Sequence, residues 1–91
     1  MGRRMTDQDI LDGLSRILGS LLGDEATVLT PQTTRQDVPG WDSLVYINFI
    51  VAVESEFGVK FRLADVDSFE TVGDIVQEIK ALKAPRVKGT S

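Results

Sequence analysis

Residues 43–57 constrain the fold of this chain most, because they are apolar over most of a helical circumference. One apolar stripe recurs at helical spacing and consists of Tyr46, Phe49, Ile50, Val53 and Phe57. A second stripe consists of Leu44, Ile47 and Val51. Asp42 or Ser43 begins the predicted helix, and Gly58 ends it as a C-terminal cap. Such a helix either buries both faces or turns one face to the core and the other to a partner.

Amphipathic segments on both sides predict two further long helices. The first covers residues 6–21, with a capping box from Thr6 to Asp9 and a staple between Met5 and Ile10; Gly23 ends it, and its apolar positions are Ile10, Leu14, Ile17, Leu18 and Leu21. The last predicted helix begins near Thr71, where Thr71 and Asp74 resemble a second capping box, and Pro85 ends it. Its apolar face consists of Val72, Ile75, Val76, Ile79 and Leu82. Lys80 and Lys83 suit the negative end of its dipole.

The segments between these helices predict loops and one short helix. Residues 24–39 form a long first loop that Val28 and Leu29 are expected to anchor, and Gly40 supplies a turn. Residues 59–61 are read as an extended connector, and residues 63–67 as a short helical turn. We therefore predict an all-α fold, a small antiparallel-type four-helix bundle with three longer helices and one short helix. Residues 6–84 form the domain, between flexible ends at 1–5 and 85–91, and deleting 86–91 should leave folding intact.

Composition excludes several classes of function. The 91 residues include no cysteine and no histidine, so a thiolate metal site, a Cys-His pair and a Ser-His-Asp triad are impossible. Asp65 and Asp67 do not continue into a calcium loop, since Phe69 and Glu70 occupy positions that need a glycine and oxygen ligands. No apolar run is long enough to span a membrane and no secretory signal is recognised, so we expect a cytoplasmic protein without a metal.

The charge is unevenly distributed along the chain. The net charge is −4, but residues 37–78 carry nine acidic side chains against Lys60 and Arg62, a local balance of −7. This argues against binding to nucleic acid or an anionic membrane, because both need a basic patch. It favours a partner with a positive surface, although acidic side chains also simply keep a small domain in solution.

The segment Gly40-Trp41-Asp42-Ser43-Leu44 carries the candidate chemistry. Taken alone, Asp42 and Ser43 are read as simple helix caps. Ser43 at a helix start is also suited to hold a phosphodiester, near unpaired N–H groups and the positive dipole end. Trp41 is either a partly buried lid over the loop or an exposed recognition residue, and we expect partial burial.

With its flanking elements, this segment resembles the phosphopantetheine attachment motif of acyl and peptidyl carrier proteins, whose centre is Asp-Ser-Leu. The resemblance covers residues 7–83, including Glu54-Ser55-Glu56-Phe57-Gly58 and Thr71-Val72-Gly73-Asp74-Ile75. It implies that a phosphopantetheinyl transferase attaches 4′-phosphopantetheine to Ser43, with Asp42 and Leu44 beside it. It also implies a partner surface for acyl-loading and acyl-processing enzymes, made of Trp41, Leu44, Val45, Ile47, Asn48, Val51 and Glu54.

The resemblance implies a monomeric carrier of acyl thioesters, not an enzyme. Val45, Asn48 and Trp41 depart from the pattern of carriers for housekeeping fatty-acid synthesis, which have more acidic residues along this helix. A specialised pathway, making a polyketide, a modified lipid or a cell-surface component, is therefore expected. The alternatives are an aminoacyl or peptidyl carrier, and a carrier-like helical adapter without a prosthetic group.

Overall fold

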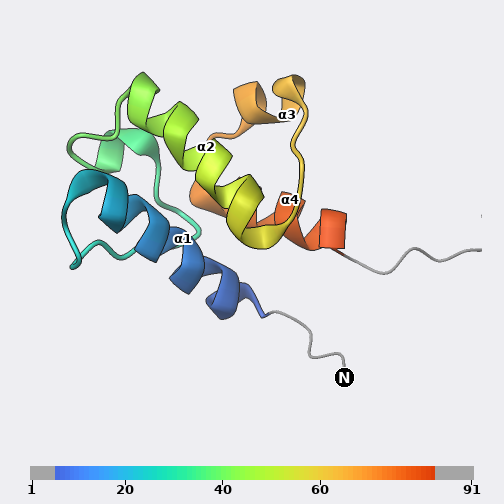
Figure 1. Ribbon diagram of the computed structural model, residues 1–91, viewed down its shortest axis with the longest axis horizontal. Helices are drawn as coiled ribbons and strands as arrows, with labels where there is room; N and C mark the ends of the chain where they lie inside the picture. Colours follow the sequence, from blue (N-terminus) through green and yellow to red (C-terminus); the bar gives the residue numbers. More distant parts are fainter. Residues whose placement is uncertain (1–5, 84–91) are drawn as a thin grey trace, which may run out of the picture.

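The computed structural model describes residues 6–83, and in this range it contains four α-helices, one short 3₁₀ helix and no strand (Figure 1). The α-helices are α1 (Asp7–Leu22), α2 (Ser43–Phe57), α3 (Leu63–Ser68) and α4 (Val72–Lys83), and the 3₁₀ helix is η1 (Arg35–Asp37). The predicted all-α fold, with three longer helices and one short helix, is confirmed. The expectations for Met5, for Pro85 and for both chain ends concern residues outside the described range.

Local capping sets the ends of the helices. At the start of α1, Thr6 Oγ1 accepts from the Asp9 N–H at 3.1 Å, and Asp9 Oδ2 accepts from the Thr6 N–H at 3.0 Å, which is the predicted capping box. Gly23 and Gly58 end α1 and α2 in the left-handed conformation, with φ of 70° and 67°. The boundaries of these two helices therefore follow from side chains close in sequence.

The core lies between α1, α2 and α4. Among the described residues, five side chains at the bundle centre are completely buried: Leu14, Leu18, Phe49, Val53 and Ile79. Two positions that we predicted on apolar faces are instead exposed, Leu21 at 40% and Leu82 at 44%. Both lie in the last turn of their helices, so they extend past the packed centre of the bundle.

Helices α1 and α2 lie side by side and run in opposite directions (Figure 1). The C-terminal ends of α2 and α4 meet, since Lys83 Nζ donates to the Phe57 carbonyl at 3.0 Å. Lys80 Nζ lies 2.7 Å from Asp7 Oδ1 at the start of α1. The two lysines that we assigned to the dipole of their own helix thus join α4 to its neighbours.

The long first loop is fastened to both α1 and α4. Leu29 is buried at 3% and its N–H donates to Ser15 Oγ at 2.9 Å, whereas Val28 is 77% exposed. The expectation of two anchors is right for Leu29 and wrong for Val28, because successive side chains of an extended segment point to opposite sides. Further along, the carbonyls of Pro31 and Thr33 accept from the first two N–H groups of α4, at 2.9 and 2.8 Å. These bonds satisfy amides that an α-helix leaves unpaired.

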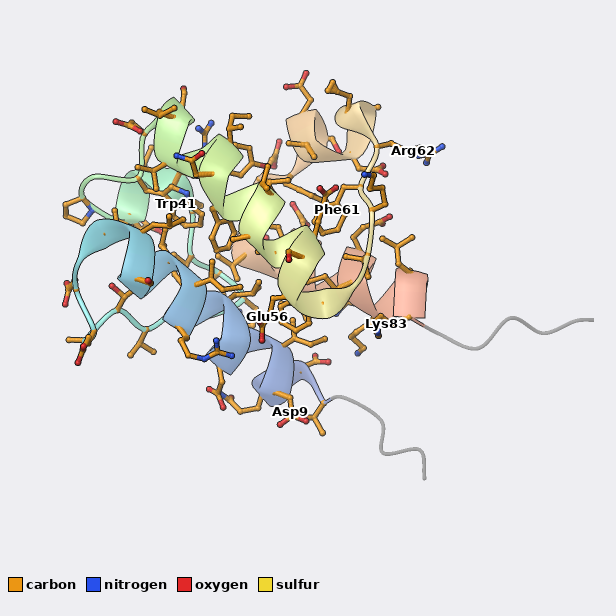
Figure 2. The ribbon with its side chains drawn as sticks, viewed as in Figure 1. Asp9, Trp41, Glu56, Phe61, Arg62 and Lys83 are labelled. Carbon is orange, nitrogen blue, oxygen red and sulfur yellow. The ribbon has the colours of Figure 1, made fainter. Side chains whose placement is uncertain are left out.

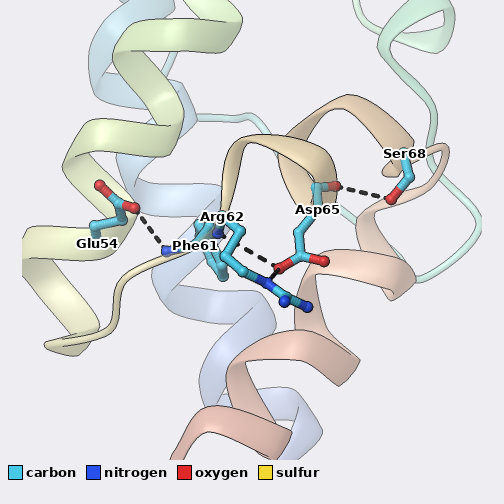
Figure 3. A network of polar contacts seen from close by, with 5 residues as sticks. All are labelled: Glu54, Phe61, Arg62, Asp65 and Ser68. Atoms are coloured by element: carbon cyan, nitrogen blue, oxygen red, sulfur yellow. Dashed lines mark hydrogen bonds and ion pairs between the residues drawn. The ribbon is translucent and has the colours of Figure 1, made fainter.

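The connector after α2 is extended, as predicted, and leads into α3 (Figure 3). Phe61 is buried at 8% and packs edge-on against Phe69, with ring centroids 5.5 Å apart. Helix α3 itself has no buried residue and is stabilised locally, since Arg62 Nε lies 3.3 Å from Asp65 Oδ2 and Ser68 Oγ donates to the Asp65 carbonyl. It is therefore a short surface helix beside α2.

Candidate functional site

The chain enters α2 through a tight turn that presents Ser43. Gly40 has φ of 88°, a conformation that favours glycine. Asp42 is the N-cap, and its Oδ1 accepts from the Val45 N–H at 2.9 Å. Ser43 is the first residue of α2, and its side chain is exposed.

The first turn of α2 leaves hydrogen-bond donors free beside Ser43. Asp42 satisfies two amides, since its side chain accepts from Val45 and its carbonyl accepts from Tyr46. Within residues 6–83, the N–H groups of Ser43 and Leu44 and the Ser43 hydroxyl have no hydrogen-bond partner. Free amides at the positive end of a helix dipole are suited to a phosphate group. The start of α2 therefore fits a phosphodiester on Ser43.

Trp41 is buried beneath the start of α2 rather than exposed on it (Figure 2). Its side chain is 6% exposed and packs edge-on against Phe49, with ring centroids 5.1 Å apart. This corrects the inclusion of Trp41 in the partner surface and exceeds the partial burial that we expected. Its indole Nε1 is buried without a hydrogen-bond partner in the described chain. An orphaned donor costs about 1–3 kcal/mol, which packing of the large ring offsets.

Tyr46 connects α2 to α3 and to the first loop. Its hydroxyl donates to the Val66 carbonyl at 2.7 Å, and the Arg35 guanidinium carbon lies 4.6 Å from its ring centroid. Burial raises the pKa of Tyr46 above its usual 10.0, an effect that the Arg35 charge opposes and the Asp67 charge reinforces. We predicted Tyr46 only as a core residue. Its position at the N-terminal end of the stripe was the one sign of a polar role in the sequence.

The second apolar stripe of α2 is exposed. Leu44 is 70% exposed, Ile47 53% and Val51 58%, and Asn48 also faces solvent. Ser43, Ile47 and Val51 follow one another at intervals of four, so they form one row along the helix. Val45 is half-buried and packs against the core. The two stripes of α2 thus have the two different environments that the sequence allowed, core and solvent.

Glu54 forms a hydrogen bond to the connector that follows α2 (Figure 3). Its Oε2 accepts from the Phe61 N–H at 2.8 Å, which ties the connector to α2. This bond gives Glu54 a structural role, and its place in the partner surface stays a prediction. Glu54 and Phe61 are seven positions apart, one on α2 and the other in the connector, so no local pattern showed the bond.

Neither a metal site nor a membrane helix is found among residues 6–83. Asp, Glu, His and Cys side chains nowhere gather in threes with the geometry to hold a metal ion there. None of the helices in this range is both long and apolar enough to cross a bilayer.

Comparison with known proteins places this site in a family. Residues 12–79 match the sequence profile described as "Phosphopantetheine attachment site". The chain is 33% identical over 78 residues to a meromycolate extension acyl carrier protein of Mycolicibacterium smegmatis, covering 86% of this chain and 79% of that protein. It is 36% identical over 73 residues to an acyl carrier protein of Thermotoga maritima, covering 80% and 90%.

A solved structure shares the fold. The solution NMR structure of a holo acyl carrier protein from Geobacter metallireducens matches with a TM-score of 0.75 and 33% identity, covering 82% of this chain and 86% of that one. The profile match runs from within α1 to within α4, and the exposed Ser43 lies inside it. The chain therefore belongs to the phosphopantetheine-binding acyl carrier proteins, which are not catalysts but hold acyl groups on a covalently attached 4′-phosphopantetheine.

Proposed function

We propose that the Ser43 hydroxyl is the attachment point of 4′-phosphopantetheine. The observation that carries this proposal is an exposed hydroxyl at the first position of α2, beside the free amides of Ser43 and Leu44. A phosphopantetheinyl transferase joins the Ser43 oxygen to the phosphopantetheine phosphorus of coenzyme A; the pyrophosphate bond of coenzyme A breaks, adenosine 3′,5′-bisphosphate leaves, and the transferase takes up the hydroxyl proton. The thiol at the end of the arm then holds acyl groups as thioesters, which a chain without cysteine has no other means to do.

Asp42 and Leu44 support the attachment in different ways. Asp42 fixes the first turn of α2 through its bond to the Val45 N–H, and its charge remains available to a cation in the transferase. Leu44 offers an apolar contact next to the arm. Neither residue is assigned acid–base chemistry, because the transferase supplies it.

The partner surface that we propose consists of the exposed side chains beside the arm. Leu44, Ile47, Asn48 and Val51 form it, with half-buried Val45 and Glu54 at its edge. Trp41 is left out, since it is buried under α2. Acyl-loading and acyl-processing enzymes are the partners of this surface, and the carrier acts as a monomer in the cytoplasm.

The cargo that we propose is acyl rather than aminoacyl. The two relatives described above are named acyl carrier proteins, one of them for meromycolate extension. A fatty-acyl or related lipid intermediate of a specialised pathway agrees with these names and with the uncharged Val45 and Asn48 on α2. Loading tests with acyl and aminoacyl ligases, followed by mass measurement of the thioester, distinguish the two classes of cargo.

Intact mass spectrometry tests the attachment directly. The protein is co-expressed with a broad-specificity phosphopantetheinyl transferase, and we expect wild type to gain one phosphopantetheine. Ser43→Ala should gain none, whereas the matched control Ser55→Ala, also exposed on α2, should be modified like wild type. An unmodified wild type, or a modified Ser43→Ala, would refute the proposal.

The exposed stripe of α2 also supports a second function, that of an adapter that binds partners without an arm. A pull-down with Ser43→Ala separates the two, because an adapter needs no serine hydroxyl. Full biological activity of Ser43→Ala in cells would favour the adapter.

A further inference from the structure

We propose that the Trp41 indole N–H binds a carbonyl oxygen of the group tethered to Ser43, in a recess beside the start of α2. This inference rests on the proposed attachment at Ser43. It makes Trp41 a specificity-determining residue of the carrier. The ligand that it assigns to the recess is an uncharged, largely apolar chain that carries a carbonyl oxygen.

The indole is a donor for which the fold supplies no acceptor. Trp41 Nε1 is buried without a hydrogen-bond partner among residues 6–83, and an indole N–H can only donate. Buried polar groups in folded proteins nearly always have a partner. The ring is held in place, because it packs edge-on against the completely buried Phe49 and lies 6.4 Å from the Tyr46 ring, centroid to centroid. The donor therefore has a fixed position and lacks an acceptor.

Trp41 lines a recess between the first loop, α2 and the start of α4. The empty volume of the recess is about 220 Å³, including the part that opens to solvent. Its apolar lining includes Val72 and Ile75, which are buried, and Phe69, which is partly buried. The enclosed part has room for little more than one water molecule. A larger ligand therefore enters by displacing a side chain at the open side.

The polar side chains of the recess favour an uncharged ligand. Arg35 and Glu70 both line it, and both are exposed without an ion pair in the described part of the chain. Their opposite charges offset each other. The hydroxyl oxygens of Thr33 and Thr71 already accept from backbone N–H groups. The indole N–H is thus the buried donor that remains for a ligand.

Ser43 is placed to deliver such a ligand. Ser43 and Tyr46 are three positions apart on α2, so they are neighbours on the helix surface, and Tyr46 lines the recess. A group tethered to the serine meets the recess at a high effective concentration, so a single hydrogen bond with a modest apolar contact suffices to hold it. The 4′-phosphopantetheine arm contains amide carbonyls, a loaded chain adds the thioester carbonyl, and a 3-oxo chain adds one more. All of them offer the same kind of acceptor.

NMR of the indole tests this assignment, because Trp41 is the only tryptophan in the sequence. The isotope-labelled apo protein is modified by a broad-specificity phosphopantetheinyl transferase with coenzyme A, octanoyl-coenzyme A or 3-oxo-octanoyl-coenzyme A. In the form that supplies the acceptor, we expect the indole proton to shift downfield and to exchange with solvent about tenfold more slowly. A shift with the bare arm identifies an arm amide. A shift that first occurs with octanoyl identifies the thioester, and one confined to the 3-oxo form identifies the oxygen of the cargo itself.

Trp41→Phe separates the hydrogen bond from the packing, because phenylalanine keeps an aromatic ring against Phe49 and removes the N–H. The rise in Tm on loading should be larger in wild type than in Trp41→Phe by about 4–8 °C, the effect of one hydrogen bond in a domain of this size. Ser43→Ala is the control for tethering. With the same transferase and acyl-coenzyme A, its indole signal should stay as it is in the apo protein.

An indole signal that is the same in the apo protein and in every loaded form would overturn the proposal while Ser43 is still modified. A persistent cross-peak from the indole proton to water in every loaded form would also overturn it, because the acceptor would then be a buried water. Equal rises in Tm for wild type and Trp41→Phe, or an indole shift in Ser43→Ala, would count against it as well. Absence of any mass gain in wild type would overturn the attachment at Ser43 and this inference with it.

Discussion

The substitution Tyr46→Phe isolates one hydrogen bond between α2 and α3. It removes the hydroxyl that donates to the Val66 carbonyl at 2.7 Å, while the ring that packs against Trp41 stays. An ordinary intramolecular hydrogen bond contributes about 1 kcal/mol net. In a domain of this size that corresponds to a fall in Tm of about 4–8 °C. Helix α3 has no buried residue, so few other contacts compensate.

The pH dependence of the same bond has a definite sign. Burial raises the pKa of folded Tyr46 above 10.0, so the folded state favours the protonated phenol. Its contribution to stability is therefore complete below 10.0 and is lost as pH rises through the higher folded value. The difference in Tm between wild type and Tyr46→Phe should be largest at neutral pH and should narrow in alkali.

Thermal melts followed by circular dichroism give both quantities. Lysine titration affects the two proteins alike and cancels in their difference. Tyr46 is the only tyrosine in the sequence, so its phenolate absorbance reports its pKa without overlap. Equal Tm values at neutral pH would show that the bond does not hold α3. A phenolate that titrates at or below 10.0 would refute the argument from burial.

Substitutions at three further positions test other parts of the fold. Asp42→Ala should cost about 1 kcal/mol through loss of the Val45 cap, and Asp42→Asn should restore most of it in urea unfolding; equal losses for both would contradict the cap. The N–H groups of Glu70 and Thr71 lower the pKa of Asp74, so this carboxylate contributes stability that is lost as pH falls from 3.8 through the lower folded value. Asp74→Asn should therefore flatten the acid side of the Tm profile, and an unchanged slope would count against this. Gly73→Ala would place a Cβ 2.8 Å from the Pro31 carbonyl oxygen and should lower the free energy of unfolding by about 1–3 kcal/mol. Full stability in urea would show that the loop moves to make room.

Much of the fold was predictable because it depends on residues close in sequence. The capping box at Thr6, the left-handed glycine at position 58 and the cap by Asp42 each need only three or four neighbouring residues. The two stripes of α2 follow from helical spacing alone. The place of Ser43 at the start of α2 belongs to this class, whereas its role as an attachment point came from the resemblance of the whole segment to the carrier motif.

The sequence by itself thus determined the helices, their ends and the presentation of Ser43. The tertiary structure decided which of two similar side chains is buried: Leu29 and not Val28, Trp41 and not Leu44. It also decided the partners of polar groups, since Glu54 binds the connector and the Tyr46 hydroxyl binds α3. These outcomes depend on how helices pack and on chain segments that meet only in the folded bundle. A local pattern contains no information on either.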